Sequence, residues 1–317
     1  MTYFNVSYAA TKSLHAIDDW LATCQANVSG SVRVAFKESV LTYKGSNTII
    51  TRAPNNFAAG EMIGEQTLVT GDTQVNWKQG ELVATSEDTH FGIQGDGFFI
   101  VTDPATTNYG VGPLYFAGNT TVAGSQKAYL TRDGEFHWQT VLNSAGVNIG
   151  TLFTGVVDEQ VLCTKEGLVV VGDYGGNSDD WHAAITKTAF YDNINPEKPS
   201  VVQPSYDGAF NTGYPTTIVD YNELQYSKYG STIYDAPSAN SYKTIVNGGL
   251  GNFDRRDQFP PGQISGTTLR EKYLESSNTD SARNLTEMAA LGKMYNGFVQ
   301  LIKAYNGTLD EILGFIR

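Results

Sequence analysis

The chain has 317 residues and a net charge of −12, and only 17% of its residues are charged. This length suits two or three domains, or one elaborate β domain with extensions. The acidic balance argues against nucleic acid as a partner, because phosphate contacts draw on Lys and Arg. The two cysteines, Cys24 and Cys163, are too few for a disulfide framework and have no metal-ligand spacing. Two separate buried thiols are the preferred interpretation, and a single bridge is the alternative.

The N-terminal segment, residues 1–30, predicts an amphipathic helix that ends near "SGS". Its apolar positions step by three and four: Leu14, Ile17, Leu21, Cys24 and Val28. No basic stretch followed by an apolar stretch predicts a secretory signal peptide, so any export is expected to proceed without a cleaved one. No run of ~18 apolar residues predicts a transmembrane helix, so no membrane insertion is expected.

Residues 31–275 predict a β body, because short apolar runs alternate with turn residues. "GELVATS" and "GFFIVTD" are strand candidates, and Glu166-Gly167 precedes a further apolar run. Asp133-Gly134 is a strong signal for a two-residue hairpin turn. Residues 174–261 are rich in Tyr, Asn, Ser, Gly and Pro and have weak periodicity. We interpret them as an elaborated subregion of irregular β structure with long loops.

Glycines surround an aspartate in "HFGIQGDGFFIV", residues 90–101. They do not form G-x-G-x-x-G, and a strand rather than a helix follows, so a phosphate-binding loop is not predicted. Gly95 and Gly97 instead permit positive φ and a tight entry into the strand. Phe98 and Ile100 would face one side of a sheet and the next residues the other, which predicts burial on both faces. No ligand is needed to explain the loop.

The C-terminal segment, residues 276–317, predicts a second amphipathic helix, with a coiled-coil seam as an alternative. "SNTD" supplies N-cap candidates. Three interior glycines each weaken an isolated helix by roughly 1 kcal/mol, so other helices pack there or the helix is poorly formed alone. The apolar positions are Leu285, Met288, Tyr295, Phe298, Ile302, Tyr305, Leu309, Ile312 and Ile316.

Catalytic, cofactor-binding and metal-binding residues are not predicted. None of the four histidines has a second ligand at a helical metal-site spacing, and neither a P-loop nor a G-x-S-x-G elbow occurs. Asp179-Asp180 beside Trp181 and His182 is the best candidate for a carbohydrate-like site, although a solvated loop with one buried Trp is the preferred interpretation. An enzyme is therefore not expected.

Two segments, "FGIQGDGFFIV" and "YLTRDGEF", together resemble the bacterial flagellar rod and hook proteins. The first resembles that family's A-I-x-G-x-G-F-F-x-V strand, and the second its Y-T-R-D-G-x-F segment with Leu130 inserted. "KQGELVATSEDTHF", "QANVSGSVRVAFKES" and "LESSNTDSARNLTEM" resemble further family segments, all in the family's order. Ala35 stands where the family usually has Gly, and "GKMYNGF" replaces its Q-R-A-Y segment. The residues that carry the resemblance are Gly95, Gly97, Phe98, Phe99, Arg132, Asp133, Gly134, Phe136, Ser277 and Asn278.

The resemblance implies a mainly β chain with long N- and C-terminal helices, the helical ends pairing into an inner tube layer with irregular β domains outside. It implies a structural axial subunit that assembles with copies of itself into a hollow helical filament, with other axial proteins above and below as further partners. Leaderless export to an extracellular or cell-envelope appendage is expected. The residues expected to pack between subunits are Leu14, Ile17, Leu21, Leu285, Met288, Tyr295, Phe298, Ile302, Tyr305, Leu309 and Ile312.

An adhesin-like, secreted β binding module is the alternative hypothesis. Its contacts would come from tyrosine-rich loops, because aromatic side chains are typical of recognition surfaces. The tyrosines concerned are Tyr221, Tyr226, Tyr229, Tyr234 and Tyr242.

Overall fold

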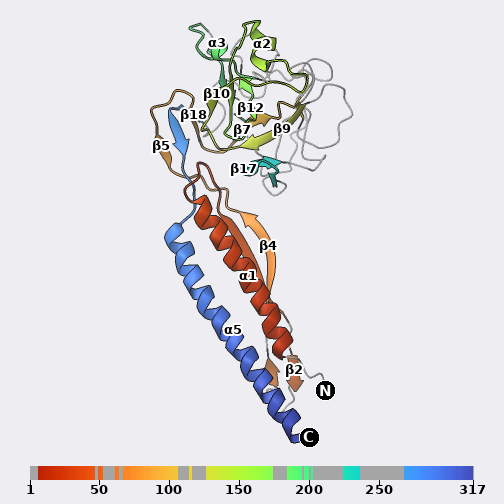
Figure 1. The fold of residues 1–317 in the computed structure, drawn as a ribbon. Helices are drawn as coiled ribbons and strands as arrows, with labels where there is room; N and C mark the ends of the chain where they lie inside the picture. Colours follow the sequence, from red (N-terminus) through yellow and green to blue (C-terminus); the bar gives the residue numbers. More distant parts are fainter. Residues whose placement is uncertain are drawn as a thin grey trace, which may run out of the picture. The chain divides into compact units, whose positions relative to one another are not determined.

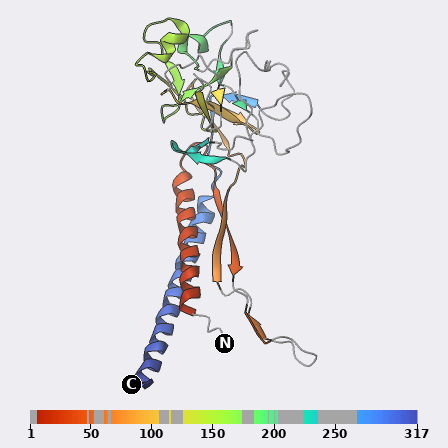
Figure 2. The same ribbon diagram turned by 90° about the vertical axis from the view of Figure 1, so that its right-hand side faces the viewer.

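The structure is a computed structural model in which the chain forms two compact units (Figures 1 and 2). One unit comprises Met1–Val32, Lys37–Asn76 and Thr279–Arg317, and the other comprises Arg33–Phe36 and Trp77–Asn278. We call them the helical unit and the sheet unit. The β body expected over residues 31–275 is therefore divided between the two. The described residues are 6–46, 49–52, 61–63, 67–105, 114–115, 126–173, 184–194, 196–199, 201–202, 224–235 and 268–316.

The helical unit contains both ends of the chain. Helix α1 spans Val6–Gly30 and helix α5 spans Ser281–Ile316, so the helices expected from apolar spacing are present. They lie side by side in both views, the end of α1 beside the start of α5 (Figures 1 and 2). The strands of this unit form two antiparallel pairs, β1 (Ser39–Ser46) with β4 (Thr67–Val75) and β2 (Ile49–Arg52) with β3 (Glu61–Ile63).

Helix α1 is covered on two of its faces. Ile17 and Cys24, seven residues apart, form a buried cluster with Leu291 of α5. A second pair of the same spacing meets the strands: the Ser13 hydroxyl accepts a hydrogen bond from the backbone N–H of Leu68, and Trp20 stacks on Tyr43. This second face of α1 therefore packs against the strand pair β1–β4.

The expected fold class is wrong. Helix accounts for 34% and strand for 33% of the structure, so the chain is a mixture of α and β rather than mainly β. The long helix α5, with 36 residues, contributes much of this helix, whereas many strands have only two to four residues. The expected separation of a helical layer from outer β domains also fails, because β4 packs directly on α1.

The sheet unit is built around an extended sheet in the order β10-β11-β12-β7-β9-β17-β16, with β15 on β7 and β8 on β9. Its other described strands form the pairs β13–β14, β18–β6 and β19–β5. Two short helices accompany them, α2 (Ile149–Thr154) and α3 (Lys187–Phe190). The strands are β5 (Leu82–Ala84), β6 (Phe91–Gln94), β7 (Phe98–Thr102), β8 (Leu114–Tyr115), β9 (Gln126–Thr131), β10 (His137–Gln139), β11 (Val161–Cys163), β12 (Val169–Val170), β13 (Gly172–Asp173), β14 (Lys198–Pro199), β15 (Val201–Val202), β16 (Gln225–Ser227), β17 (Gly230–Asp235), β18 (Thr268–Glu271) and β19 (Tyr273–Glu275).

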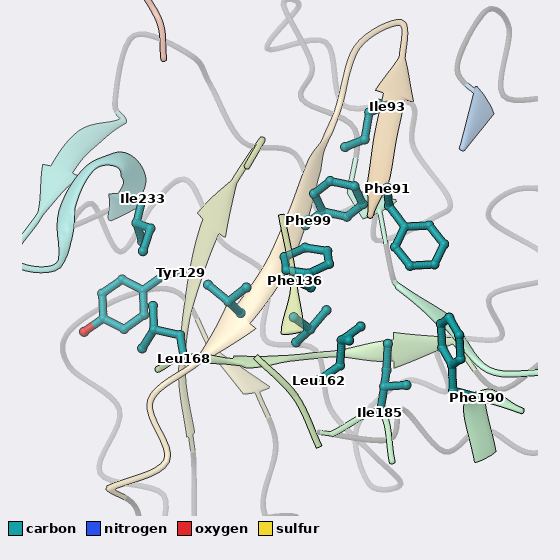
Figure 3. Packing of buried hydrophobic residues seen from close by; sticks show 12 residues of the cluster. Phe91, Ile93, Phe99, Tyr129, Phe136, Leu162, Leu168, Ile185, Phe190 and Ile233 are labelled. Atoms are coloured by element: carbon teal, nitrogen blue, oxygen red, sulfur yellow. The ribbon is translucent and has the colours of Figure 1, made fainter. Parts of the chain in front are cut away.

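Strand β7 is the centre of this unit. It pairs with β9 along one edge and with β12 and β15 along the other, and all five of its residues are buried. Burial on both faces is therefore confirmed. Figure 3 shows the aromatic core beside it, in which the rings of Phe99 and Phe136 meet edge to face at 5.2 Å between centroids. Edge-to-face contact of this kind is favourable beyond the area that it buries.

The hairpin predicted at Asp133-Gly134 does not form. Strand β9, before it, pairs with β7 and β17, whereas β10, after it, pairs with β11. Gly134 serves close approach instead, because a Cβ there would lie 1.6 Å from the carbonyl oxygen of Phe91. The Gly134 carbonyl accepts the Phe91 backbone N–H at 3.0 Å, which ties this segment to β6.

The remaining expectations for the sheet unit can be tested only in part. Cys163, like Cys24 in the helical unit, is a free and buried thiol, which confirms the preferred interpretation. The candidate carbohydrate site at residues 179–182 lies outside the described residues, as do Tyr221 and Tyr242 and most of residues 174–261. Of the other three loop tyrosines, Tyr234 is buried in strand β17 and Tyr226 is 43% exposed.

Replacing Gly134 with Ala should destabilise the sheet unit by about 1–3 kcal/mol or more, because the new methyl group meets a backbone carbonyl that cannot rotate away. The change is measured as the shift of the urea unfolding midpoint. Gly292→Ala is the control, since nothing lies within 4 Å of a Cβ at that position of α5. Equal stability of Gly134→Ala and the wild type would contradict the observed packing.

Candidate functional site

The described surface of α5 carries exposed apolar side chains in a regular array. Met294, Leu301 and Phe315 fall on one line of seven-residue steps, and they are 43%, 47% and 90% exposed. Beside this line, Leu309 and Ile312 are 40% and 55% exposed. Leu291 is the last buried side chain among the described residues of α5. The distal part of this helix therefore presents an apolar surface, which we call the outer α5 face (Met294, Leu301, Leu309, Ile312 and Phe315).

The residues expected to pack between subunits divide into two groups. Ile17 is 1% exposed and offers nothing to a second copy, while Leu21, Met288 and Phe298 pack partly buried against the same α1–α5 cluster. The residues Leu14, Ile302 and Tyr305 are half-buried, and Leu285, Tyr295, Leu309 and Ile312 are exposed.

The apolar spacing did not identify every buried or every exposed apolar residue of α5. It passed over Leu291, the most buried side chain of α5, and over Met294, Leu301 and Phe315. The signal was present, because Leu291 lies seven residues before Phe298 and Met294 lies seven before Leu301. Tyr295, Ile302 and Leu309 form a third line of this kind. A helix with three lines of apolar residues has more apolar surface than one neighbouring helix can cover.

The α1–α5 seam also contains polar groups that fix how the helices pair. The Asn27 amide donates to the Asn284 side chain and to the Ser39 carbonyl, and Asn284 donates to Glu38. Burial raises the pKa of the Cys24 thiol to about 11, with a further contribution from the Glu287 carboxylate nearby. This thiol is therefore protonated at neutral pH and is a poor nucleophile.

In the sheet unit, the glycine loop between β6 and β7 encloses an arginine. Gly95 and Gly97 have φ of 103° and 143°, as expected, and their carbonyls turn inward. The Arg132 guanidinium donates to both of these carbonyls, at 2.8 and 3.0 Å, and at 3.4 Å to the carbonyl of Ile93. The loop carbonyls therefore bind the Arg132 side chain of the same chain, at the position where a cation or ligand would otherwise bind.

A carboxylate completes this arrangement. Glu275, at the end of β19, accepts the Arg132 Nε–H at 2.8 Å, and the two side chains are 0% and 2% exposed. The other Glu275 oxygen accepts the backbone N–H of Gly80 at 2.8 Å. The buried charges are therefore both paired and hydrogen-bonded, which is what burial requires.

Two further motif positions have structural roles. The Asn278 side chain donates to the Lys78 carbonyl, and its backbone N–H donates to the Phe36 carbonyl, while Ser277 is half-buried beside it. Ala35, where the resembling family usually has Gly, has φ of 55° and is fully buried. The position thus adopts the left-handed backbone that favours Gly, although this chain has Ala there.

Asp133 is a buried carboxyl beside this arrangement. Burial is the largest cause that raises its pKa, to about 7, and the nearby Glu166 and Glu135 carboxylates add to the effect. Hydrogen bonding to the backbone N–H of Glu135, and the Lys165 ammonium, act in the opposite direction. This carboxyl therefore changes charge near neutral pH.

The described residues contain no group of three or more His, Cys, Asp or Glu side chains that could hold a metal ion. The Nδ1 atom of the His90 ring lies 3.1 Å from the Thr85 hydroxyl, which is within hydrogen-bonding distance. No described helix is long and apolar enough to cross a membrane. The sequence matches no protein-family model and no curated protein.

Replacing Arg132 with Met should cost about 3–5 kcal/mol of stability, because Glu275 is left buried without a partner. The double change Arg132→Met with Glu275→Leu should cost less than the single change, since it removes both charges. Urea unfolding of the single and double variants measures the difference. A cost below about 1 kcal/mol for Arg132→Met would show that the ion pair does not hold the glycine loop in place.

Asp133→Asn should flatten the pH dependence of stability. The folded-state pKa of Asp133, about 7, lies above the ordinary value of 3.8, so the folded state keeps a proton that the unfolded chain releases. Its stabilising contribution is present below the ordinary value and is lost as pH rises through the folded value. Unfolding midpoints at about pH 5 and about pH 8 should differ less in Asp133→Asn than in the wild type. The exposed Asp310→Asn is the control, and equal pH dependence in all three proteins would contradict the assignment.

Proposed function

We propose that this chain is a structural subunit that assembles with copies of itself into a hollow helical filament, of the flagellar rod and hook kind or a related surface appendage. In this proposal the protein acts outside the cell or in its envelope. It has no catalytic role. The outer α5 face is the observation that carries the proposal.

The physical argument begins with exposed area. Fully burying a side chain such as Leu, Ile, Met or Phe contributes ~1.5–3 kcal/mol, and each side chain of the outer α5 face is two-fifths or more exposed. Covering all five would therefore contribute roughly 4–8 kcal/mol, enough to support association in a repeating contact. A contiguous apolar strip of this kind marks an interaction surface more often than a solvent-facing one.

The partner is a second copy because the face continues the α1–α5 seam. Its lines of seven-residue spacing are those of a helix packed by several helical neighbours, and this chain supplies helices of that pattern itself. A contact between unlike surfaces of identical subunits generates an open helical array when its rotation does not close. The charge of −12 on each copy opposes association, so the contact must be predominantly apolar.

The sequence resemblance supports the same conclusion independently. Its motif residues Gly95, Gly97 and Arg132 meet in one buried cluster, although they come from separate segments. Segments that resemble those of one family in the same order, and that also pack together, are difficult to attribute to coincidence.

Leu309→Asp should abolish filaments while leaving the single chain folded. The substitution places an uncompensated charge in a contact that excludes water, and such a charge is strongly disfavoured. Leu309 is 40% exposed in the single chain, so the variant can keep its helix and its sheet unit. Sedimentation and negative-stain electron microscopy measure assembly, and thermal unfolding measures the fold.

Gln300→Asp is the matched control. It adds the same charge to an exposed position of α5 that lies on the opposite side of the helix from the apolar lines. Filaments should persist in this variant. A wild-type protein that stays monomeric at high concentration, or a Leu309→Asp protein that assembles as well as Gln300→Asp, would refute the proposal.

The alternative function is an adhesin-like secreted binding module. Exposed tyrosines favour it, since Tyr226 and Tyr273 of the sheet unit are 43% and 37% exposed. Assembly of the full chain separates the two functions, because a binding module acts without the terminal helices and should form no filaments. The filament proposal depends instead on those helices.

A further inference from the structure

A shallow hollow of about 450 Å³ lies in the surface of the sheet unit, where the two-stranded pairs β5–β19 and β6–β18 meet. Its size falls in the range of small-ligand sites. Its lining combines two amides, one cation, one aromatic ring and one aliphatic side chain: Gln79, Gly80, Leu82, Gln94, Arg270 and Tyr273.

An unusual backbone conformation brings the cation and the ring together. Arg270 and Tyr273 are three residues apart, so a regular strand would direct them to opposite faces. Lys272, between them, has φ of 62°, and this left-handed residue interrupts the alternation between β18 and β19. Both side chains consequently line the same hollow.

The surrounding structure holds Lys272 firmly in this conformation. Its backbone N–H donates to the His90 carbonyl at 2.8 Å, and its carbonyl accepts from Thr85 at 2.7 Å. Its ammonium group pairs with Asp88 at 2.8 Å. A strained backbone that several contacts maintain is a frequent feature of binding sites.

The Arg270 guanidinium is oriented but has spare donors. Its Nε–H donates to the Gln94 side-chain oxygen at 2.8 Å, and within the described residues it makes no ion pair. An arginine with free terminal N–H groups suits a carboxylate, which it can bind through two parallel hydrogen bonds. Among the described residues, Arg33, Arg132 and Arg283 each pair with a carboxylate, whereas Arg270 does not.

The rest of the hollow is preorganised for an amphipathic ring. The Gln79 amide is fixed, since it donates to the Ile93 carbonyl and accepts from the Gly95 N–H. Tyr273 and Leu82 form the apolar wall over Gly92, where a Cβ would lie 3.2 Å and 2.9 Å from atoms of these two side chains. Gly92 thus lets the wall sit close to the strand.

We propose that this hollow binds a saccharide that carries a carboxylate, of the hexuronic acid class. The guanidinium of Arg270 takes the carboxylate, the amides of Gln79 and Gln94 hydrogen-bond to ring hydroxyls, and the Tyr273 ring packs against the apolar face of the sugar. A shallow, exposed lining of amides with one aromatic ring suits a sugar better than a fully apolar ligand, which needs enclosure. This proposal stands independently of filament assembly.

Binding of tetrameric galacturonate and glucuronate oligosaccharides to the full chain is the test, measured by saturation-transfer NMR and calorimetry. The methyl-esterified oligosaccharides are the matched ligands, because they keep the sugar and lose the charge. Arg270→Gln and Tyr273→Ala should each weaken binding about tenfold or more, and so should esterification. Arg283→Gln and Tyr8→Ala, which remove the same groups from exposed positions outside the hollow, should leave binding unchanged.

Three results would overturn the proposal. They are the absence of wild-type binding to all of these uronates, equal binding by Arg270→Gln in a folded protein, and equal binding of the esterified sugars. A fourth is also decisive: if Arg270→Gln impairs assembly but not sugar binding, the hollow is a contact between copies. Loss of filaments in Leu309→Asp with intact sugar binding would leave this proposal standing and separate it from the proposed function.

Discussion

The sheet unit depends on one buried ion pair. The Arg132 guanidinium supplies donors to the carbonyls of the glycine loop, and Glu275 neutralises it. Without this cation, carbonyls that point inward would lie in a water-free environment without donors, which is costly. The path of the loop, the entry into β7 and the position of β19 follow from this constraint. The glycines are needed because only residues with positive φ turn their carbonyls inward so tightly.

Local sequence patterns were sufficient to predict the elements whose conformation does not depend on which other segments pack against them. The spacing of Leu14, Ile17 and Leu21 identifies α1 because a helix closes its own hydrogen bonds. The unbroken apolar run of β7 identifies a strand buried on both faces, whichever strands flank it. The left-handed glycines were predictable for the same reason, since φ is a property of a single residue. These are statements about one segment at a time.

What could not be predicted depends on segments far apart in the chain. Asp133-Gly134 has the composition of a hairpin turn, but the approach of Phe91 determined its conformation. Glu275 is separated from Arg132 by 143 positions, so no local pattern could pair them. The fold class was wrong for a related reason. Composition indicated strands over most of the middle of the chain, but these strands are short, and the two helices hold as large a share of the structure.

The motif residues and the outer α5 face therefore answer different physical demands. Inside the sheet unit, Arg132 donates hydrogen bonds to the carbonyls of Gly95 and Gly97, so these residues serve the fold. The outer α5 face satisfies nothing within the chain, and its residues coincide only in part with those that the apolar spacing selected. Ile17 and Leu291 are buried within the chain, and the residues that folding left exposed are the ones available for association. The sequence signals of family resemblance therefore report how the chain folds. The proposed assembly depends instead on the apolar surface that folding does not use.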